Sequence, residues 1–293
     1  MRDRIDPLIA ERAPWIYRKG PHIRAIRGLL HLMLGYDETV RIAQTLEPLS
    51  SAELMDRLAD MIAVNISVKG LENIPASGPA MITCNHPTGI ADGIIMWSIL
   101  REKRPDLFFF ANRDAMRVMP QLDEIIAPVE WRKDKRTIGS NRETLTYAAQ
   151  AFKEGRLCVL FPSGRLAKRR GLKLYERPWM PSAAMLARKY ELPVIPMHIR
   201  ARNSGLFYLF DAIHPTLRDI TLFHEVLNKS RHSFHVRAAK PLDGGSLPKS
   251  AADATDVLFR ASMRAAEEGD YSVIIPKAPA RVRRRKVAIG HTY

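Results

Sequence analysis

The sequence predicts an α/β protein in which helices flank a mixed, largely parallel sheet, with a helical cap at the N-terminus. Three observations predict this class. Short apolar runs alternate with amphipathic stretches of ten to fifteen residues from residue 64 onward, a pattern typical of parallel strands joined by helices. The segment before residue 64 has only helical periodicity. The chain of 293 residues is long enough to bury a sizeable core.

The first 63 residues are expected to form the helical cap. In "HIRAIRGLLHLMLGY" the apolar residues Ile26, Leu29, Leu30 and Met33 recur at spacings of three and four, as one face of a helix requires. The stretch "SSAELMDRLADMIAV" opens with Ser50 and Glu53 in the register of a capping box, which marks a helix start. These helices are expected to cover one face of the core.

Residues 64–275 are expected to form the α/β domain. We expect strands in "VNISVKG", "AMITCN", "LFFFAN", "EIIAPVEW", "RLCVLFP", "LPVIPMHI" and "HSFHVRAAKPL", and helices in "GIIMWSILREKRP", "NRETLTYAAQAFKEG", "PSAAMLARKY" and "SAADATDVLFRASMRAA". Gly155 is the expected C-cap of the second of these helices. Residues 276–293 carry five basic residues among positions 281–286 and are expected to form a flexible basic tail. The glycine pattern of a dinucleotide site is absent from the sequence.

The formal net charge of +15 indicates an anionic partner, either nucleic acid or the head groups of a membrane. A nucleic-acid signature such as a zinc finger or a helix-turn-helix is not evident, so an anionic membrane surface is the expected partner and nucleic acid is not. The two cysteines, Cys84 and Cys158, lie in apolar runs and cannot form a disulfide framework or a four-ligand zinc site. No metal and no bound cofactor are expected. No apolar run approaches the ~18 to 20 residues of a membrane-spanning helix.

The stretch "NHPTGIADG" places His86 just beyond an expected buried strand and Asp92 near the start of the next helix. Functional groups of open α/β sheets gather at the carboxyl ends of strands. A carboxylate beside an imidazole orients it as a general base. The alternative is that Asp92 only caps the helix and that His86 only occupies a turn.

Three further segments follow this stretch in a fixed order: "APVEWRKD", "LFPSGRLAKR" and "LPVIPMHI". Together the four blocks, over roughly residues 64 to 200, resemble the glycerolipid acyltransferase family, which comprises the glycerol-phosphate and lysophospholipid acyltransferases. Five residues separate His86 from Asp92, whereas four are usual in the family. The longer spacing and the later "RARNSGLFY" are similar to a haemolysin-related branch of it.

The resemblance implies transfer of a fatty acyl group from acyl-carrier protein or coenzyme A, as a co-substrate, to the hydroxyl of a lysolipid. It makes His86 the base and Asp92 its orienting group, and Arg132 matches the arginine that contacts the acceptor's phosphate. Ser163 replaces the glutamate of the third block and Arg165 stands in place of a threonine, so lysophosphatidate, glycerol 3-phosphate and an aminolipid such as a lyso-ornithine lipid all remain open as acceptors. The expected substrate-binding residues are Asn85, Thr88, Gly89, Arg132, Phe161, Pro162, Ser163, Gly164 and Arg165.

Backbone amides near Gly89 or Gly164 are the candidate donors to the oxyanion, because glycine permits close approach of the backbone. The cysteines are expected to be spectators. We expect a membrane or a carrier to dock on Lys168, Arg169, Arg170, Lys173 and Trp179. The alternatives are that the four cations form only a solvated basic surface and that the tryptophan is buried. We expect a peripheral protein at the cytoplasmic face of the inner membrane. The rival hypothesis is a non-catalytic basic protein that binds nucleic acid or an anionic membrane.

Overall fold

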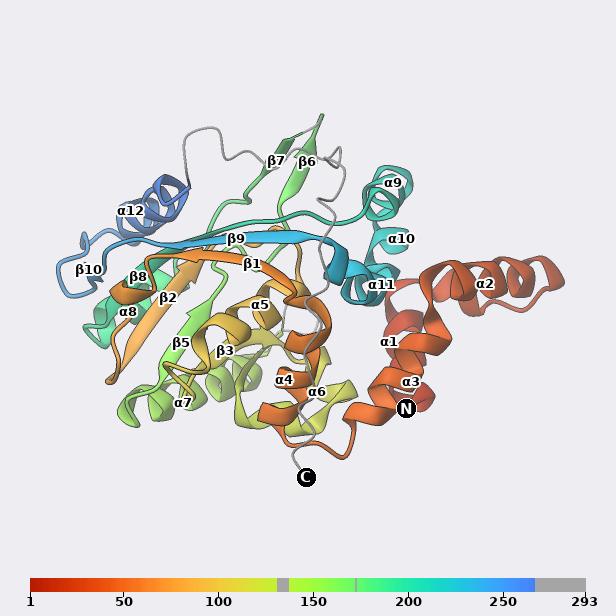
Figure 1. Ribbon diagram of the computed structural model, residues 1–293, viewed down its shortest axis with the longest axis horizontal. Coiled ribbons are helices and arrows are strands. Elements are labelled where there is room, and N and C mark those ends of the chain that lie inside the picture. The colour runs from red at the N-terminus through yellow and green to blue at the C-terminus, as the bar shows by residue number, and fades with distance from the viewer. Residues whose placement is uncertain (131–136, 172, 267–293) are drawn as a thin grey trace, which may run out of the picture.

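A computed structural model of the protein describes residues 1–130, 137–171 and 173–266. Its centre is a sheet with the strand order β1-β9-β8-β2-β5-β3-β4, and β10 pairs with β8 (Figure 1). These strands are β1 Asn65–Lys69, β2 Ala80–Cys84, β3 Phe108–Asn112, β4 Ile126–Val129, β5 Leu157–Leu160, β8 Pro193–Arg200, β9 Ser233–Ala238 and β10 Leu242–Asp243. A separate hairpin joins β6 Lys168–Arg170 to β7 Lys173–Tyr175.

The sheet is mixed and mostly parallel, which confirms the predicted fold class. Strands β8, β2, β5, β3 and β4 run parallel to one another, with Ile82 of β2 opposite Val159 and Ile195. Only β9 and β10 pair antiparallel, both with β8, and β1 pairs parallel with β9. The carboxyl ends of β8, β2 and β5 therefore meet at one edge of the sheet.

Helices cover both faces of the sheet (Figure 1). Alternate residues of β2 point to opposite faces, as a strand requires: Ile82 packs in a cluster with α4 and α5, and Met81 packs in a second cluster with α7, α8 and α12. The helices are α1 Arg2–Arg12, α2 Pro21–Leu34, α3 Tyr36–Leu46, α4 Ser51–Ile62, α5 Ile90–Leu100, α6 Asp114–Val118, α7 Ile138–Lys153, α8 Ser182–Lys189, α9 Gly205–Ile213, α10 Pro215–Ile220, α11 Leu222–Asn228 and α12 Ala251–Arg264.

The start of α4 and the end of α7 have the local structures that the sequence predicts. Ser50 accepts a hydrogen bond from the backbone of Glu53, and the side chain of Glu53 accepts one from the backbone of Ser50, so the capping box opens α4. Beyond the end of α7, Gly155 adopts a left-handed φ of 79°, where a side chain would be strained.

The segment between β8 and β9 folds as the short helices α9, α10 and α11, which the sequence pattern did not assign. A third apolar cluster joins Leu30 and Leu34 of α2 to Phe210 of α9 and Ile220 of α10. Only the inner face of α2 takes part in this cluster, and the rest of the helix projects from the body at the right of Figure 1. Within the described residues, no helix combines the length and the apolar character needed to cross a membrane.

Candidate active site

The loop between β2 and α5 brings His86 and Asp92 together. The imidazole Nδ1 of His86 lies 2.9 Å from a carboxylate oxygen of Asp92. Asp92 is fully buried, whereas the side chain of His86 keeps 19% of its surface exposed. The carboxylate therefore lies behind the imidazole, and the imidazole faces solvent beyond the carboxyl end of β2. The additional residue between the pair does not keep them apart.

The turn contracts because its own donors close on the carboxylate. The backbone N–H groups of Thr88 and Gly89 donate to Asp92 Oδ2 over 2.8 and 2.9 Å, and Thr88 Oγ1 donates to Asp92 Oδ1 over 2.5 Å. Gly89 makes this possible with a φ of 91°, a conformation that L side chains rarely adopt. Asp92 therefore caps α5 and contacts His86 at the same time, so the two interpretations of this aspartate are not alternatives.

The ring and the main chain of His86 are both held in place. Its ring stacks on Phe161, which follows β5, with centroids 4.4 Å apart. Its carbonyl accepts a hydrogen bond from Ala167 N over 2.9 Å, and its N–H donates to Glu176 Oε2 over 3.0 Å. Ala167 precedes β6 and Glu176 follows β7. Both ends of the β6–β7 hairpin are thus bonded to the peptide groups of the histidine.

Glu176 was not predicted as a site residue. Burial raises the pKa of its carboxyl group, against hydrogen bonds from His86, Ser163 and Trp179 that lower it. The indole Nε1 of Trp179 donates to Oε1 over 3.1 Å. A carboxyl group from another segment thus lies against Ser163, the residue that replaces the glutamate of the third sequence block. Only the folding of the hairpin brings it there, so the local sequence carries no signal for it.

Comparison with known proteins finds a family that this chain resembles. The profile of the family described as Acyltransferase matches residues 65–200, from the first residue of β1 to the last residue of β8. Over these residues the chain is similar to the acyltransferases. The match contains His86, Asp92 and the whole β6–β7 hairpin, and it ends just before the "RNS" segment that follows β8.

The chain is also similar to individual acyltransferases. It is 22% identical to a lyso-glycine lipid O-acyltransferase of Phocaeicola vulgatus over 204 residues, which cover 68% of this chain and 71% of that protein. It is 20% identical to the lyso-glycine lipid O-acyltransferase of Bacteroides thetaiotaomicron over 252 residues, or 84% and 90% of the two chains. The crystal structure of the 1-acyl-sn-glycerophosphate (LPA) acyltransferase PlsC from Thermotoga maritima aligns with a TM-score of 0.49 at 16% identity, over 83% of this chain and 96% of that one.

Two residues expected to bind substrate make their hydrogen bonds within the protein. Asn85 is buried, and its amide bonds in both directions with the backbone of Ile199, donating over 2.8 Å and accepting over 2.7 Å. Thr88 is 1% exposed and its hydroxyl is used by Asp92. Asn85 therefore fixes the end of β2 to β8, and Thr88 holds the carboxylate.

The glycines expected to supply oxyanion donors also use their amides internally. Gly89 N–H donates to Asp92, and Gly164 N–H donates to the carbonyl of Phe161 over 2.9 Å. Neither amide is therefore directed at a substrate in this conformation. These two amides are therefore not available as oxyanion donors in this conformation.

The remaining residues of the third block surround the histidine to different degrees. Pro162 and Ser163 are buried, and Ser163 Oγ donates to the carbonyl of Arg165 over 2.8 Å. Gly164 and Arg165 are exposed next to them. Arg132, which was expected to contact the acceptor, lies outside the described residues. Of this set, Phe161, Gly164 and Arg165 retain surfaces that a substrate can touch.

The basic segment expected to dock a membrane or a carrier is a β-hairpin. Lys168, Arg170 and Lys173 are exposed on it, and the guanidinium of Arg169 lies 5.9 Å from the ring centroid of Tyr208 in α9. Trp179 is only 8% exposed and packs edge-on against Phe259, with ring centroids 5.5 Å apart, as the alternative of a buried tryptophan requires. A tryptophan that anchors a protein in a membrane interface needs an exposed ring.

Both cysteines are fully buried, and burial raises the pKa of each thiol well above its ordinary value. A thiol of this kind is a poor nucleophile. Among the residues that the structure describes, no three or more His, Cys, Asp or Glu side chains gather in a way that could hold a metal ion.

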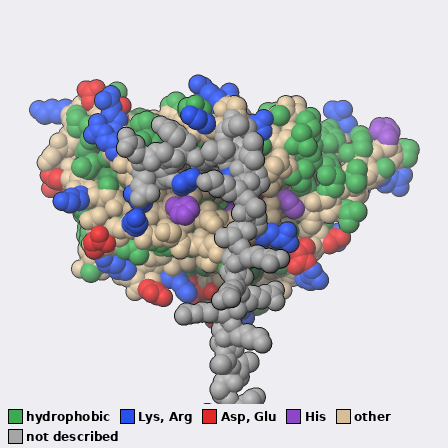
Figure 2. Space-filling view, turned by 45° about the horizontal axis from the view of Figure 1, so that its top comes forward, with side chains coloured by type: hydrophobic (Ala, Val, Ile, Leu, Met, Phe, Trp, Pro, Cys, Tyr) green, Lys and Arg blue, Asp and Glu red, His purple; other side chains and the backbone are tan. Residues whose placement is uncertain are grey.

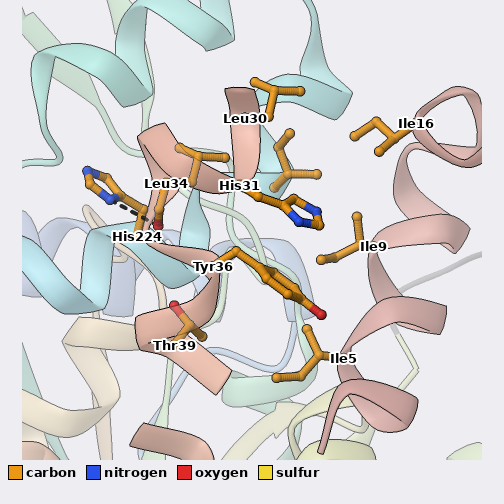
Figure 3. Close-up of a pocket in the computed structure, with 10 residues that line it drawn as sticks. Ile5, Ile9, Ile16, Leu30, His31, Leu34, Tyr36, Thr39 and His224 are labelled. Carbon is orange, nitrogen blue, oxygen red and sulfur yellow. Dashed lines mark hydrogen bonds between the residues drawn. The ribbon is translucent and has the colours of Figure 1, made fainter. Parts of the chain in front are cut away.

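A small hollow lies away from His86, between α1, α2, α3, α10 and α11 (Figure 3). Its volume is about 30 Å³, and its lining is apolar apart from His31, Tyr36, Thr39 and His224. This volume suits about one or two water molecules, and it is far too small for a fatty acyl chain. None of the predicted site residues lines it.

Proposed function

We propose that this protein moves a fatty acyl group from an acyl thioester to the hydroxyl group of a lysolipid, with His86 as the general base. The contact between His86 and Asp92 carries this proposal. It lies beyond the carboxyl end of β2 in a parallel sheet, where α/β proteins bind their ligands. Because Nδ1 faces the carboxylate, Nε2 is the nitrogen that meets the acceptor.

The proposed reaction needs no acyl-enzyme. The acceptor oxygen attacks the thioester carbonyl carbon while its proton passes to His86 Nε2, and Asp92 stabilises the cationic ring. The tetrahedral intermediate then collapses, the C–S bond breaks, and the leaving thiolate takes the proton back from the ring. The products are an ester and a free thiol. General base catalysis of this kind contributes about 10² to 10⁴-fold.

For the acceptor we propose a lysolipid with an amino-acid head group. Two relatives that align with most of this chain are named lyso-glycine lipid O-acyltransferases. The carboxylate of such a head group suits a guanidinium, which binds carboxylates through a planar fork. Arg165 is exposed beside Ser163, near the stacked pair of His86 and Phe161. We therefore assign head-group binding to Arg165.

The donor is proposed to be acyl-carrier protein or coenzyme A, held by the β6–β7 hairpin. Both donors carry phosphate, and acyl-carrier proteins present acidic surfaces. Lys168, Arg170 and Lys173 are exposed on a hairpin whose two ends are bonded to His86 through Ala167 and Glu176. A thiol carrier that docks on these cations would place its thioester close to the base.

We further propose that the enzyme works at a membrane surface, which α2 contacts. One side of α2 exposes four large apolar side chains, which we call the apolar face of α2. They are Ile26 (42% exposed), Leu29 (57%), Leu32 (81%) and Met33 (44%). Figure 2 shows hydrophobic side chains gathered at this end of the molecule, over α2 and the adjacent α9. Arg18, Lys19 and Arg24 are exposed beside this face.

An apolar helix face bordered by cations is typical of helices that lie in the interface of an anionic membrane. Sedimentation with phosphatidylglycerol vesicles tests this proposal. Replacing Leu29 and Leu32 by aspartate should abolish sedimentation, whereas Leu145→Asp on α7, where the leucine is 51% exposed, should leave it unchanged. Equal sedimentation of all three proteins would refute the assignment of α2.

Mass spectrometry of reaction products tests the chemistry. The purified protein would be offered lyso-glycine lipid, lyso-ornithine lipid, lysophosphatidate and glycerol 3-phosphate, each with acyl-carrier protein and coenzyme A thioesters. The proposal expects an acylated amino-acid lipid as the main product. Acylation of only the phosphate-bearing acceptors would contradict the proposed acceptor. No product from any pair, together with retention on duplex DNA but not on vesicles at matched salt, would favour the non-catalytic rival.

A further inference from the structure

A buried ion pair behind the Asp92 turn has no part in the proposed chemistry. Lys229, which directly follows α11, is fully buried, and Glu225 in the first turn of α11 is 2% exposed. Lys229 Nζ donates to Glu225 Oε2 over 2.6 Å, to Asn203 Oδ1 over 2.7 Å and to the Arg202 carbonyl over 3.1 Å. Removing two charges from water is costly, and such pairs are weak evidence for stability. The pair therefore calls for another explanation.

Asn203 connects this ion pair to the active-site turn. It follows β8 in the "RNS" segment, and it is 2% exposed. Its Oδ1 accepts from Lys229, and its Nδ2 lies 3.4 Å from the carbonyl oxygen of Thr88, to which it donates. The ammonium group can only donate. Lys229 thereby fixes which way the amide points, and the NH₂ group must face Thr88.

Thr88 in turn fixes the catalytic pair. Its N–H and its hydroxyl both donate to the carboxylate of Asp92, which lies 2.9 Å from the imidazole of His86. A continuous chain of polar contacts therefore runs from Lys229 through Asn203, Thr88 and Asp92 to His86. It crosses from the carboxyl end of β8 to the carboxyl end of β2, which are neighbouring strands.

The far end of this chain is itself anchored. Glu225 accepts hydrogen bonds from the backbone N–H of Ser204 over 2.9 Å and from its hydroxyl over 2.5 Å. The backbone N–H of Asn203 donates to Tyr208 Oη over 3.2 Å. The "RNS" segment is thus held between α9 and α11. It has few ways to move without breaking a buried hydrogen bond, and leaving such a group unpaired is costly.

We propose that Asn203 and Lys229 are positioning residues for acyl transfer, holding the 86–92 turn in the contracted form in which Asp92 reaches His86. The donors of the turn itself close on Asp92, but none of them binds the carbonyl of Thr88, which Asn203 reaches from outside the turn. Asn203 thereby supports the turn at this carbonyl. The inference rests on the proposed role of His86 as the base.

The test compares Asn203→Asp with the wild-type protein. Aspartate keeps the oxygen that Lys229 binds but removes the donor to Thr88. We expect kcat to fall about three- to tenfold, the range for one neutral hydrogen bond, with KM within twofold of wild type. Asn73→Ala is the matched control, because Asn73 also donates its amide to a backbone carbonyl, that of Ala238, over 3.0 Å, and lies at the other end of the sheet. Its kcat should not change.

Hydrogen exchange provides a readout that does not depend on activity. In Asn203→Asp the backbone amides of a peptide spanning 85–93 should exchange about three- to tenfold faster than in wild type, and in Asn73→Ala they should not. The loss of kcat should also be smaller when Asn203→Asp is made in a Thr88→Val background, because both changes loosen the same turn. For Lys229, the charge-balanced double variant Lys229→Met with Glu225→Gln should reproduce the faster exchange.

Wild-type exchange and wild-type kcat in Asn203→Asp would overturn the proposal. So would a fall in kcat of equal size in Asn73→Ala, which would indicate a general loss of structure. If the wild-type protein transfers no acyl group while the turn still loosens as expected, the proposed function fails and the structural link from Asn203 to the turn stands.

Discussion

The hydroxyl of Thr88 offers a defined perturbation of the His86–Asp92 pair. It donates to Asp92 over 2.5 Å in a place with no room for water, since the two side chains are 1 and 0% exposed. Thr88→Val removes this donor and keeps the shape. A hydrogen bond to a charged group contributes about 1.5 to 3 kcal/mol, so the free energy of unfolding should fall by that amount.

The activation free energy should rise by less than the full free energy of this hydrogen bond. Asp92 keeps its two backbone donors in the variant, over 2.8 and 2.9 Å, so we expect about half of that free energy to appear in the activation barrier. Half of 1.5 to 3 kcal/mol is about 0.75 to 1.5 kcal/mol. Because a tenfold change in rate corresponds to about 1.4 kcal/mol, we expect kcat to fall about three- to tenfold. KM should not change, because Thr88 is too buried to touch substrate.

The assay is the initial rate of acyl transfer at varied acceptor concentration, with urea unfolding of the same samples. Thr88→Ser is the control, because serine retains the hydroxyl, and its kcat should stay within about threefold of wild type. A wild-type kcat in Thr88→Val would show that the hydroxyl of Thr88 does not support catalysis through Asp92. An equal loss in the valine and serine variants would show the same, because the effect would then not come from the hydroxyl.

Three other predictions concern stability. Gly89→Ala should lower the free energy of unfolding by about 1 to 3 kcal/mol and reduce activity. Gly164→Ala, at an exposed position with a φ of 57° and no atom near the new Cβ, should lower it by about 1 to 2 kcal/mol. Urea titrations measure both, and an unchanged free energy of unfolding in Gly89→Ala would contradict the first prediction. Burial raises the pKa of Glu176, so above the unfolded pKa of about 4.3 the folded state binds more protons than the unfolded state, and the protein loses stability as pH rises. Glutamine carries no such proton, so the melting temperature of Glu176→Gln minus that of wild type should be higher at pH 7 than at pH 4. An equal difference at the two pH values would contradict this prediction. Burial alone would raise the pKa of Glu225, but Lys229 and Ser204 outweigh burial and lower this pKa. The contribution of Glu225 to stability is therefore present above about pH 4.3 and is lost as pH falls further. Below that pH the free energy of unfolding should fall less steeply in Glu225→Gln than in wild type, and identical slopes would contradict this prediction.

The sheet could be predicted because its signals are local. Each core strand is a short apolar run next to a turn or a helix signal, so "AMITC" and "LCVL" can be identified without knowing their neighbours. The β6–β7 hairpin could not be identified in this way. Its strands contain Lys168, Arg169, Arg170 and Lys173 and have no alternating apolar face, because the hairpin is held by backbone bonds to His86 and not by burial of its side chains.

The candidate site shows the same division. The spacing in "NHPTGIADG" indicated where His86 and Asp92 lie, but not that Thr88 would serve the carboxylate or that Asn85 would bond to β8. Glu225 and Lys229 are four residues apart, a spacing typical of an exposed ion pair on a helix, yet both are buried. Such roles depend on which segments meet in space, and a single sequence does not carry that information.

The role of His86 as the general base is tested most directly by the rate of acyl transfer by His86→Ala at saturating concentrations of donor and acceptor. His86 lies at the solvent-facing end of the contact with Asp92, so its loss should leave folding intact, as circular dichroism and urea unfolding would verify. We expect kcat to fall by about 10² to 10⁴-fold, the contribution of a general base. Transfer at the wild-type rate by the folded variant would show that this histidine is not the base.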